Sequence, residues 1–301
     1  MRKRLLGHNA EAILWVIAGT ALFSLVFASG KFAGDAASPL QIVFLRYVGG
    51  ALTLSVIAIL SSDGVAAYRS TRPFKHLGRA LFGSSGGAAI IYATANMPVV
   101  DATAISLMQV VFMILLGVLV LGERIDAQKG FGILLCCAGA ILILGSRGAF
   151  HQFDLAYVWP AAVALFGAVL IGIETILIKM LTRLDRPMTV LLYVNFFGVA
   201  LMAIPGFLVW KPIELGHVGA FLLLGPLAIA AQYCIIRGYQ IADVSVVAPI
   251  DFTWLIFAAV IGMVFFDEFP TLGVLAGAAI IIGGGCVLAI LKTKEPVRGA
   301  P

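Results

Sequence analysis

The sequence has little charge. Only 12% of its 301 residues are Asp, Glu, Lys or Arg, whereas 61% are hydrophobic. Soluble domains carry about 25% charged residues, so this composition and the long apolar runs indicate a protein that crosses a bilayer several times. The net charge of +5 is what basic loops beside a membrane produce, and it gives no reason to expect a nucleic-acid partner.

Cysteine and histidine are scarce as well. The four cysteines lie inside apolar runs, and the four histidines are scattered singly at segment ends or in loops. Neither pattern has the spacing of a disulfide framework or a metal site. The chain also has no Walker sequence, because Gly283–Gly285 is not followed by Lys and Ser or Thr. We therefore expect no metal, no cofactor and no ATP-driven transport by this chain.

Ten apolar segments are of about the length that spans a membrane, roughly 20 residues. They predict an all-α membrane protein with ten transmembrane helices at 12–32, 40–60, 76–97, 101–121, 128–146, 155–178, 188–210, 217–240, 244–266 and 271–292. The basic N-terminus could open a signal peptide, but the many apolar segments behind it favour a first membrane helix.

Lys and Arg are distributed unequally between the connections. Both termini and every second loop are basic, whereas the alternate loops hold only Lys31, Arg147 and Lys211. Because cytoplasmic loops of membrane proteins carry the excess of positive charge, we expect both termini to be cytoplasmic.

The second half of the chain repeats the first. When Ile105 is aligned with Ile250, segment 104–123 matches 249–268 without a gap, including Gly117 with Gly262 and Glu123 with Glu268. Five helices per half is an odd number, so the halves, 1–146 and 147–301, would insert as two inverted five-helix repeats. Such repeats are typical of secondary transporters, whose substrate site lies at the repeat interface near the membrane midplane. The alternative is a duplication retained only for packing.

Glycines recur at matching places in the fifth and tenth segments. Gly132 and Gly139 correspond to Gly277 and Gly284. Small residues let membrane helices approach closely, so we expect these faces to hold the halves together. The pair Gly83 and Gly87 in the third segment is interpreted in the same way.

One acid lies well inside the ninth apolar segment. A carboxylate in hydrocarbon is costly unless it faces a cavity or a partner, so Asp251 is a candidate for binding a substrate amine or carrying a proton. A structural ion pair or hydrogen bond is the alternative. Trp254 follows one turn later, and the repeat matches Asp251 with Ser106 and Trp254 with Gln109.

Further polar and aromatic positions predict a cavity lining. The remaining candidates on the third, fourth and eighth segments are Tyr92, Asn96, Gln109, Gln232 and Tyr239. The aromatic rings could stack on a substrate, or could belong to the core or face lipid.

Two more charged positions have open interpretations. Arg46 could hold a substrate carboxylate bidentately or form a structural pair. Glu174 is a second candidate for proton coupling; alternatively it pairs with Lys179 or reaches toward the interface. Glu123 and Glu268 are interpreted as caps of turns.

Several of these positions resemble the EamA domain. They are Arg46-Tyr47, the run Gly122-Glu123 with Gly132 and Gly139, and the second copy from Ala248-Pro249 through Gly262 and Glu268 to Gly284. Over nearly its whole length the chain is similar to ten-helix members of the drug/metabolite transporter superfamily. It departs from the pattern at Asp267, where glycine is expected, and Arg46 has no counterpart in the second half.

The resemblance implies an inner-membrane secondary transporter that works by alternating access. Helices one to four of each half would enclose a central cavity, with helices five and ten outside it. Many relatives export amino acids or other small metabolites, and others take up S-adenosylmethionine or move sugar phosphates. The aromatic and amide lining favours zwitterions, so we expect an exporter of amino acids, including hydrophobic and aromatic ones.

Three alternatives remain. One is an uptake carrier for S-adenosylmethionine or another metabolite, and one is a channel. The third, an intramembrane lipid-modifying enzyme, would need a cluster of His, Asp or Ser with catalytic spacing, which the sequence does not offer. We expect a carrier rather than an enzyme, and because one chain holds both halves, a functional monomer in the bilayer.

Overall fold

The structure is a computed structural model that describes residues 8–61, 68–96, 102, 105–146, 155–266 and 271–290. Within these residues it contains helices and no strands. They are α1 (His8–Ala33), α2 (Pro39–Leu60), α3 (Pro73–Asn96), α5 (Met108–Leu121), α6 (Ala127–Ser146), α7 (Leu155–Leu181), α8 (Pro187–Leu208), α9 (Leu215–Ile241), α10 (Val244–Val247), the 3₁₀ helix η2 (Ala248–Phe252), α11 (Thr253–Phe266) and α12 (Leu272–Ile290).

The helices follow the predicted segments closely, with two differences. The segment predicted as one helix over 244–266 is divided into α10, η2 and α11. Pro249 has no backbone N–H and its ring clashes with the preceding turn, so the α-helical ladder is interrupted there. In the matching place of the first half, the segment predicted as one helix over 101–121 is broken by a turn at Leu107, which lies between helical Ile105–Ser106 and the start of α5 at Met108.

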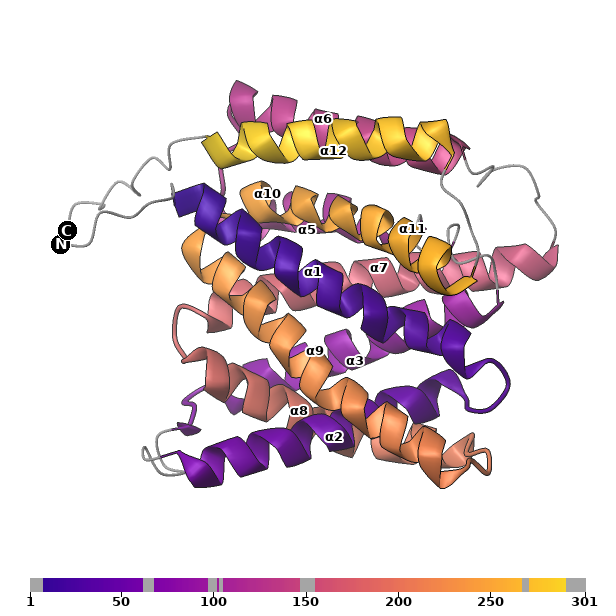
Figure 1. The fold of residues 1–301 in the computed structure, drawn as a ribbon. Coiled ribbons are helices and arrows are strands. Elements are labelled where there is room, and N and C mark those ends of the chain that lie inside the picture. The colour runs from indigo at the N-terminus through magenta and orange to yellow at the C-terminus, as the bar shows by residue number, and fades with distance from the viewer. Residues whose placement is uncertain are drawn as a thin grey trace.

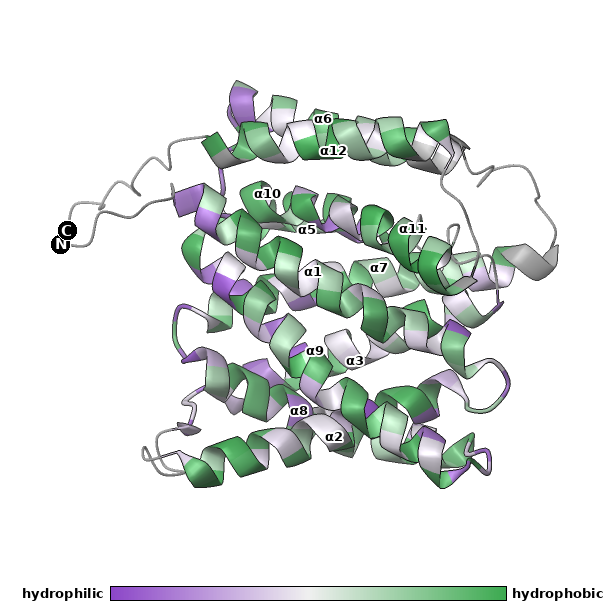
Figure 2. Ribbon diagram, viewed as in Figure 1, coloured by the Kyte–Doolittle hydropathy of each residue, from purple (hydrophilic) through white to green (hydrophobic). Residues whose placement is uncertain are grey.

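The helices are suited to a membrane. Six helical spans in the described residues are long and apolar enough to cross a bilayer, and three shorter apolar helices accompany them. Figure 2 shows hydrophobic residues along the helix bodies and hydrophilic ones concentrated toward the ends. Large apolar side chains such as Leu119, Ile204 and Leu223 are 70%, 72% and 71% exposed, as expected of a surface that lipid covers. The chain therefore forms a multi-pass membrane protein.

The helices are arranged in layers (Figure 1). The antiparallel pair α6 and α12 forms an outer layer, α2 and α8 lie on the opposite side of the bundle, and α9 runs diagonally from α1 to α2. Between them, α1 packs against α9 and α3 packs against α7. In the internal repeat α1 matches α7 and α3 matches α9, so these two contacts are equivalent in the two halves.

Glycine sets the contact between α6 and α12. A Cβ on Gly139 would lie 2.6 Å from the carbonyl oxygen of Gly277, and one on Gly284 would lie 2.9 Å from that of Gly132. Any larger residue would push the two backbones apart. The predicted close packing of these glycines is confirmed.

The interpretation of Gly83 and Gly87 as a helix-packing pair is wrong. A Cβ on Gly87 would have no atom within 4 Å, and one on Gly83 would meet the carboxylate of Glu174. Gly86 instead makes the close approach to the α7 backbone, since its Cβ would lie 2.8 Å from the Ile171 side chain and 3.2 Å from the carbonyl oxygen of Gly167. Whether a glycine of α3 packs against α7 or borders open space depends on the face of the helix that carries it. Residue spacing alone did not show which face points toward α7.

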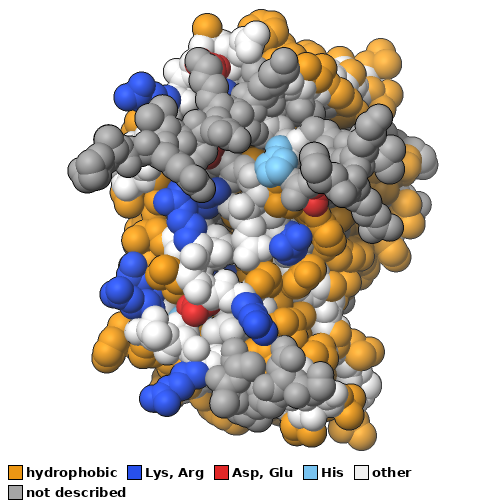
Figure 3. All heavy atoms as spheres, turned by 90° about the vertical axis from the view of Figure 1, so that its left-hand side faces the viewer, with side chains coloured by type: hydrophobic (Ala, Val, Ile, Leu, Met, Phe, Trp, Pro, Cys, Tyr) orange, Lys and Arg blue, Asp and Glu red, His pale blue; other side chains and the backbone are white. Residues whose placement is uncertain are grey.

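The helix ends meet at two opposite faces. We call one the basic end; there α1 begins, α12 ends, and Lys and Arg side chains gather (Figure 3). At this end Glu123 accepts hydrogen bonds of 2.8 Å from the backbone N–H groups of both Val244 and Ser245. Glu123 is therefore a cap, as predicted, although it caps α10 of the other half; Glu268 lies outside the described residues. Lys129 forms an ion pair of 3.0 Å with Asp243 beside it.

Candidate functional site

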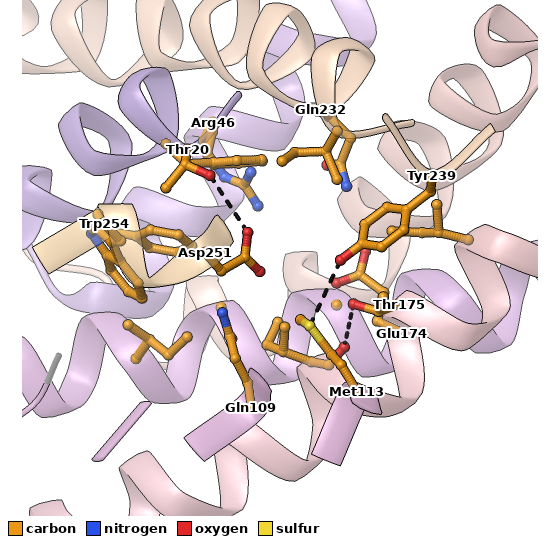
Figure 4. A pocket seen from close by; sticks show the side chains of 18 of the residues that line it. Thr20, Arg46, Gln109, Met113, Glu174, Thr175, Gln232, Tyr239, Asp251 and Trp254 are labelled. Carbon is orange, nitrogen blue, oxygen red and sulfur yellow. Dashed lines mark hydrogen bonds between the residues drawn. The ribbon is translucent and has the colours of Figure 1, made fainter. Parts of the chain in front are cut away.

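A cavity of about 110 Å³ lies in the middle of the bundle (Figure 4). Its walls come from α1, α2, α3, α5, α7, α9, η2 and α11, so both halves contribute. Among the described residues, none of α6, α8 or α12 lines it. Its polar side chains are Thr20, Arg46, Gln109, Glu174, Thr175, Gln232, Tyr239 and Asp251.

Aromatic rings form one side of the cavity. The rings of Phe27 and Trp254 have centroids 5.0 Å apart, and those of Phe23 and Phe27 are 5.6 Å apart. Tyr47 of α2 also reaches the lining. Such contiguous rings offer a surface for the apolar part of a small molecule.

Asp251 reaches the cavity from the interrupted ninth segment. The 3₁₀ turn of η2 directs its carboxylate into the open space, as Figure 4 shows. Thr20 donates a hydrogen bond of 3.5 Å to its Oδ1 atom. Within the described part of the chain, no Lys, Arg or His lies within ion-pair distance of Asp251. The side chain is 9% exposed, so a buried carboxylate faces the cavity with no described cation within ion-pair distance.

Arg46 supplies the opposite charge. Its guanidinium carbon lies 4.2 Å from the centroid of the Tyr47 ring, a cation–π distance. The side chain is buried, its Nε has no hydrogen-bond partner, and no carboxylate of the described residues is within ion-pair distance. Arg46 and Asp251 thus face one cavity as charges that the protein itself leaves without an ion pair (Figure 4).

Glu174 has a different environment. Its Oε1 atom lies 3.5 Å from Nε of Arg79. The suggestion that Glu174 pairs with Lys179 is wrong, because the ammonium of Lys179 instead donates to the backbone carbonyls of Tyr239 and Ala242 at the end of α9. These carbonyls have no helical partner, and a cation near them is favourable.

Uncharged groups complete the polar lining. The Oε1 atom of Gln109 is buried without a hydrogen-bond partner, which leaves it available to a ligand. The hydroxyl of Tyr239 lies 3.7 Å from the Met113 sulfur, and Thr175 donates to the Ile171 carbonyl at 3.0 Å. Among the described residues, no three His, Cys, Asp or Glu side chains are grouped so as to hold a metal ion.

The structure brings most of the sequence-predicted residues together. Those that line the cavity are Arg46, Gln109, Glu174, Gln232, Tyr239, Asp251 and Trp254. Tyr92 and Asn96 are not part of this lining; Asn96 is exposed and donates a hydrogen bond of 2.8 Å to the carbonyl of Tyr92 on its own helix. Sequence reasoning missed Thr20, Thr175 and the two phenylalanines of α1, because such residues are ordinary in a membrane helix.

Comparison with known proteins fits this geometry. The family model described as "EamA-like transporter family" matches the chain twice, over residues 10–145 and 158–290. The chain belongs to the EamA-like transporter family. Each match covers one half of the duplication inferred from the sequence.

Curated relatives of this EamA protein are transporters with different substrates. The chain is 28% identical to the pseudopaline exporter CntI of Pseudomonas aeruginosa, covering 95% of this chain and 97% of the relative. It is 29% identical to a riboflavin transporter of Rhizobium johnstonii, covering 89% and 87%. It is 24% identical to an S-adenosylmethionine uptake transporter of Rickettsia bellii, covering 88% and 90%.

The fold of this EamA protein also matches a solved crystal structure. The TM-score is 0.76 over 95% of this chain and 99% of the other, with 21% sequence identity. At that identity the likeness shows the fold alone. Together, the family and the relatives show a transporter, and the substrate has to be argued from the cavity.

Proposed function

We propose that this protein is an inner-membrane secondary transporter that exports amino acids, including hydrophobic and aromatic ones, and similar small metabolites. One observation carries the proposal: Arg46 and Asp251 line the same cavity, and neither has an ion-pair partner among the described residues. Arg46 would bind the substrate carboxylate bidentately, and Asp251 would bind its ammonium group. The rings of Phe27 and Trp254 would take the apolar side chain.

The charge of the lining supports a zwitterion over a phosphate ester. A sugar phosphate would need several cations around its phosphate group. Arg46 is the one Lys or Arg among the described residues that line this cavity. Gln109 and Gln232 add neutral donors and acceptors, which can position a substrate without changing the net charge.

We also propose that the two halves are inverted repeats, 1–146 and 147–301, that alternate access to the cavity. The duplicated family match and the corresponding contacts of α1 with α9 and α3 with α7 support this arrangement. In inverted-repeat transporters one half rocks against the other around a site near the midplane. The basic end would then be cytoplasmic, with both termini on that side, and a single chain would suffice for transport.

Asp251 is the proposed proton-coupling group, with Glu174 the second candidate. Asp251 lines the cavity beside Thr20, and no cation of the described residues lies within ion-pair distance to hold its charge. It can therefore exchange a proton for the substrate ammonium. Glu174 already has a cation beside it in Arg79, which makes it the weaker candidate.

The test is uptake of radiolabelled amino acids into proteoliposomes of the purified protein, with and without an imposed pH gradient. The proposal expects saturable, amino-acid-selective flux that responds to the gradient. Folded protein that carries S-adenosylmethionine but no amino acid would favour the uptake-carrier alternative. Flux that does not saturate would indicate a channel.

A further inference from the structure

We propose that Arg79, a residue outside the cavity lining, determines which net charge of substrate the cavity accepts. This inference rests on the proposed function, because it assumes that the central cavity binds the substrate. Arg79 acts through Glu174 and is thus a positioning residue that touches no substrate.

Arg79 is placed firmly behind the cavity wall. Its side chain is fully buried on α3, and its Nη1 atom donates a hydrogen bond of 3.1 Å to the carbonyl of Val190 on α8. Its Nε atom lies 3.5 Å from Oε1 of Glu174 on α7. Since Glu174 lines the cavity and Arg79 does not, the carboxylate stands between the guanidinium and the substrate space.

Gly83 makes this arrangement possible. It lies one helical turn after Arg79, and a Cβ at this position would be 2.5 Å from the carboxyl carbon of Glu174. Only glycine lets the carboxylate rest against the α3 backbone within reach of Arg79. With any side chain here, Glu174 would have to move.

The consequence is electrostatic. Arg79 lies within ion-pair distance of Glu174 and Arg46 does not, so the charge of Glu174 is largely balanced by Arg79. Arg46 and Asp251 then remain as one cation and one anion for the substrate. Without Arg79 the cavity gains a net negative charge, and without Glu174 it gains a net positive one. Inside a protein, an unbalanced unit charge several ångströms from a charged ligand changes affinity by about tenfold or more.

The experiment measures competition binding of three amino acids with unbranched side chains of similar length to purified protein. Methionine is zwitterionic, lysine carries an extra positive charge and glutamate an extra negative charge. The wild type should prefer methionine. Arg79→Gln should shift the lysine-to-methionine affinity ratio about tenfold toward lysine, and Glu174→Gln should shift the glutamate-to-methionine ratio by a similar factor toward glutamate.

The double variant separates this role from a structural one. Arg79→Gln with Glu174→Gln removes both charges and should restore the preference for methionine. If Arg79 served only to hold the fold, removing its partner as well would not restore selectivity. Lys75→Gln, on the same helix but at the basic end, is the matched control and should leave all three affinities unchanged.

The outcomes are distinct. If Arg79→Gln does not fold, Glu174→Gln and the double variant still test the opposite shift and its reversal. Folded single variants whose ratios stay at the wild-type values, or a double variant that keeps the bias of a single one, would overturn the role of Arg79. A folded wild type that binds none of the three amino acids would instead overturn the proposed function, and the inference with it.

Discussion

Gly86 and Gly87 are neighbours on α3 but face different surroundings. A Cβ on Gly86 would lie 2.8 Å from Ile171 and 3.2 Å from the carbonyl of Gly167 on α7, whereas one on Gly87 would have nothing within 4 Å. Gly86 belongs to a dry helix contact, and Gly87 lines the central cavity. The same residue type therefore holds helices together at one position and leaves room for a substrate at the next.

The contrast between close helix contacts and open cavity lining extends through the molecule. At the dry contacts, glycine backbones approach until no side chain fits. In the cavity, the Nε atom of Arg46 and the Oε1 atom of Gln109 are buried without hydrogen-bond partners, which would be unfavourable unless a ligand or water satisfied them. Substitutions at the first kind of position should affect folding, and those at the second kind should affect transport.

The largest effect is expected for Gly225→Val on α9. Its Cβ would overlap the backbones of Gly49 and Gly50 on α2, and no rotamer can relieve a clash of backbone with backbone. We expect a destabilisation of about 3 kcal/mol or more, seen as loss of the monodisperse peak in size-exclusion chromatography in detergent. Gly219→Val on the same helix is the control, because its Cβ would meet no atom within 4 Å. Equal behaviour of the two variants would contradict the packing account.

Asp251→Asn should abolish the response of transport to a pH gradient while the protein folds normally. The amide has nearly the same shape and still accepts from Thr20, but it neither exchanges a proton nor pairs with an ammonium group. Flux into proteoliposomes at several pH gradients measures the change. Asp35→Asn, an exposed position outside the cavity, serves as the control. Gradient-driven flux equal to the wild type would remove Asp251 from the coupling mechanism.

Substitutions at the two neighbouring glycines sharpen the comparison. Gly86→Ala should lower the free energy of unfolding by about 1–3 kcal/mol, because Ile171 and the α7 backbone have to shift. Gly87→Ala should leave stability nearly unchanged, and Gly87→Leu should lower substrate affinity by filling the cavity. Melting curves and binding on the same samples separate the effects. A Gly87→Ala variant less stable than Gly86→Ala would reverse the assignment of the two faces.

The smallest effect is expected at the basic end. Lys129→Gln breaks the partly exposed ion pair with Asp243, in which the two side chains are 15% and 42% exposed. Exposed pairs contribute about 0.2–1 kcal/mol and are screened by salt. We expect a slight fall in melting temperature that disappears at high ionic strength. A salt-independent loss would mean that Lys129 acts in some way other than through this pair.

Much of this organisation is local enough to be predicted from the sequence. Apolar segment length marked the helices, and the internal alignment brought Gln109, Asp251 and Trp254 forward as candidates before their contacts were known. The interruption at Pro249 was missed because the apolar run continues through it.

The ion pair of Arg79 with Glu174 could not be predicted, since it joins helices far apart in the chain and depends on the absent side chain of Gly83. Tyr92 and Asn96 are spaced one helical turn apart, but spacing does not say which face of α3 meets the cavity.

The central claim is that Arg46 binds the carboxylate of a zwitterionic substrate. The most direct measurement is a thermodynamic cycle: binding of methionine and of its decarboxylated amine to the wild type and to Arg46→Gln. We predict that the wild type binds methionine about tenfold or more tightly than the amine, as expected for a charged hydrogen-bonded pair, and that Arg46→Gln loses this discrimination. Equal discrimination by both proteins would contradict the account.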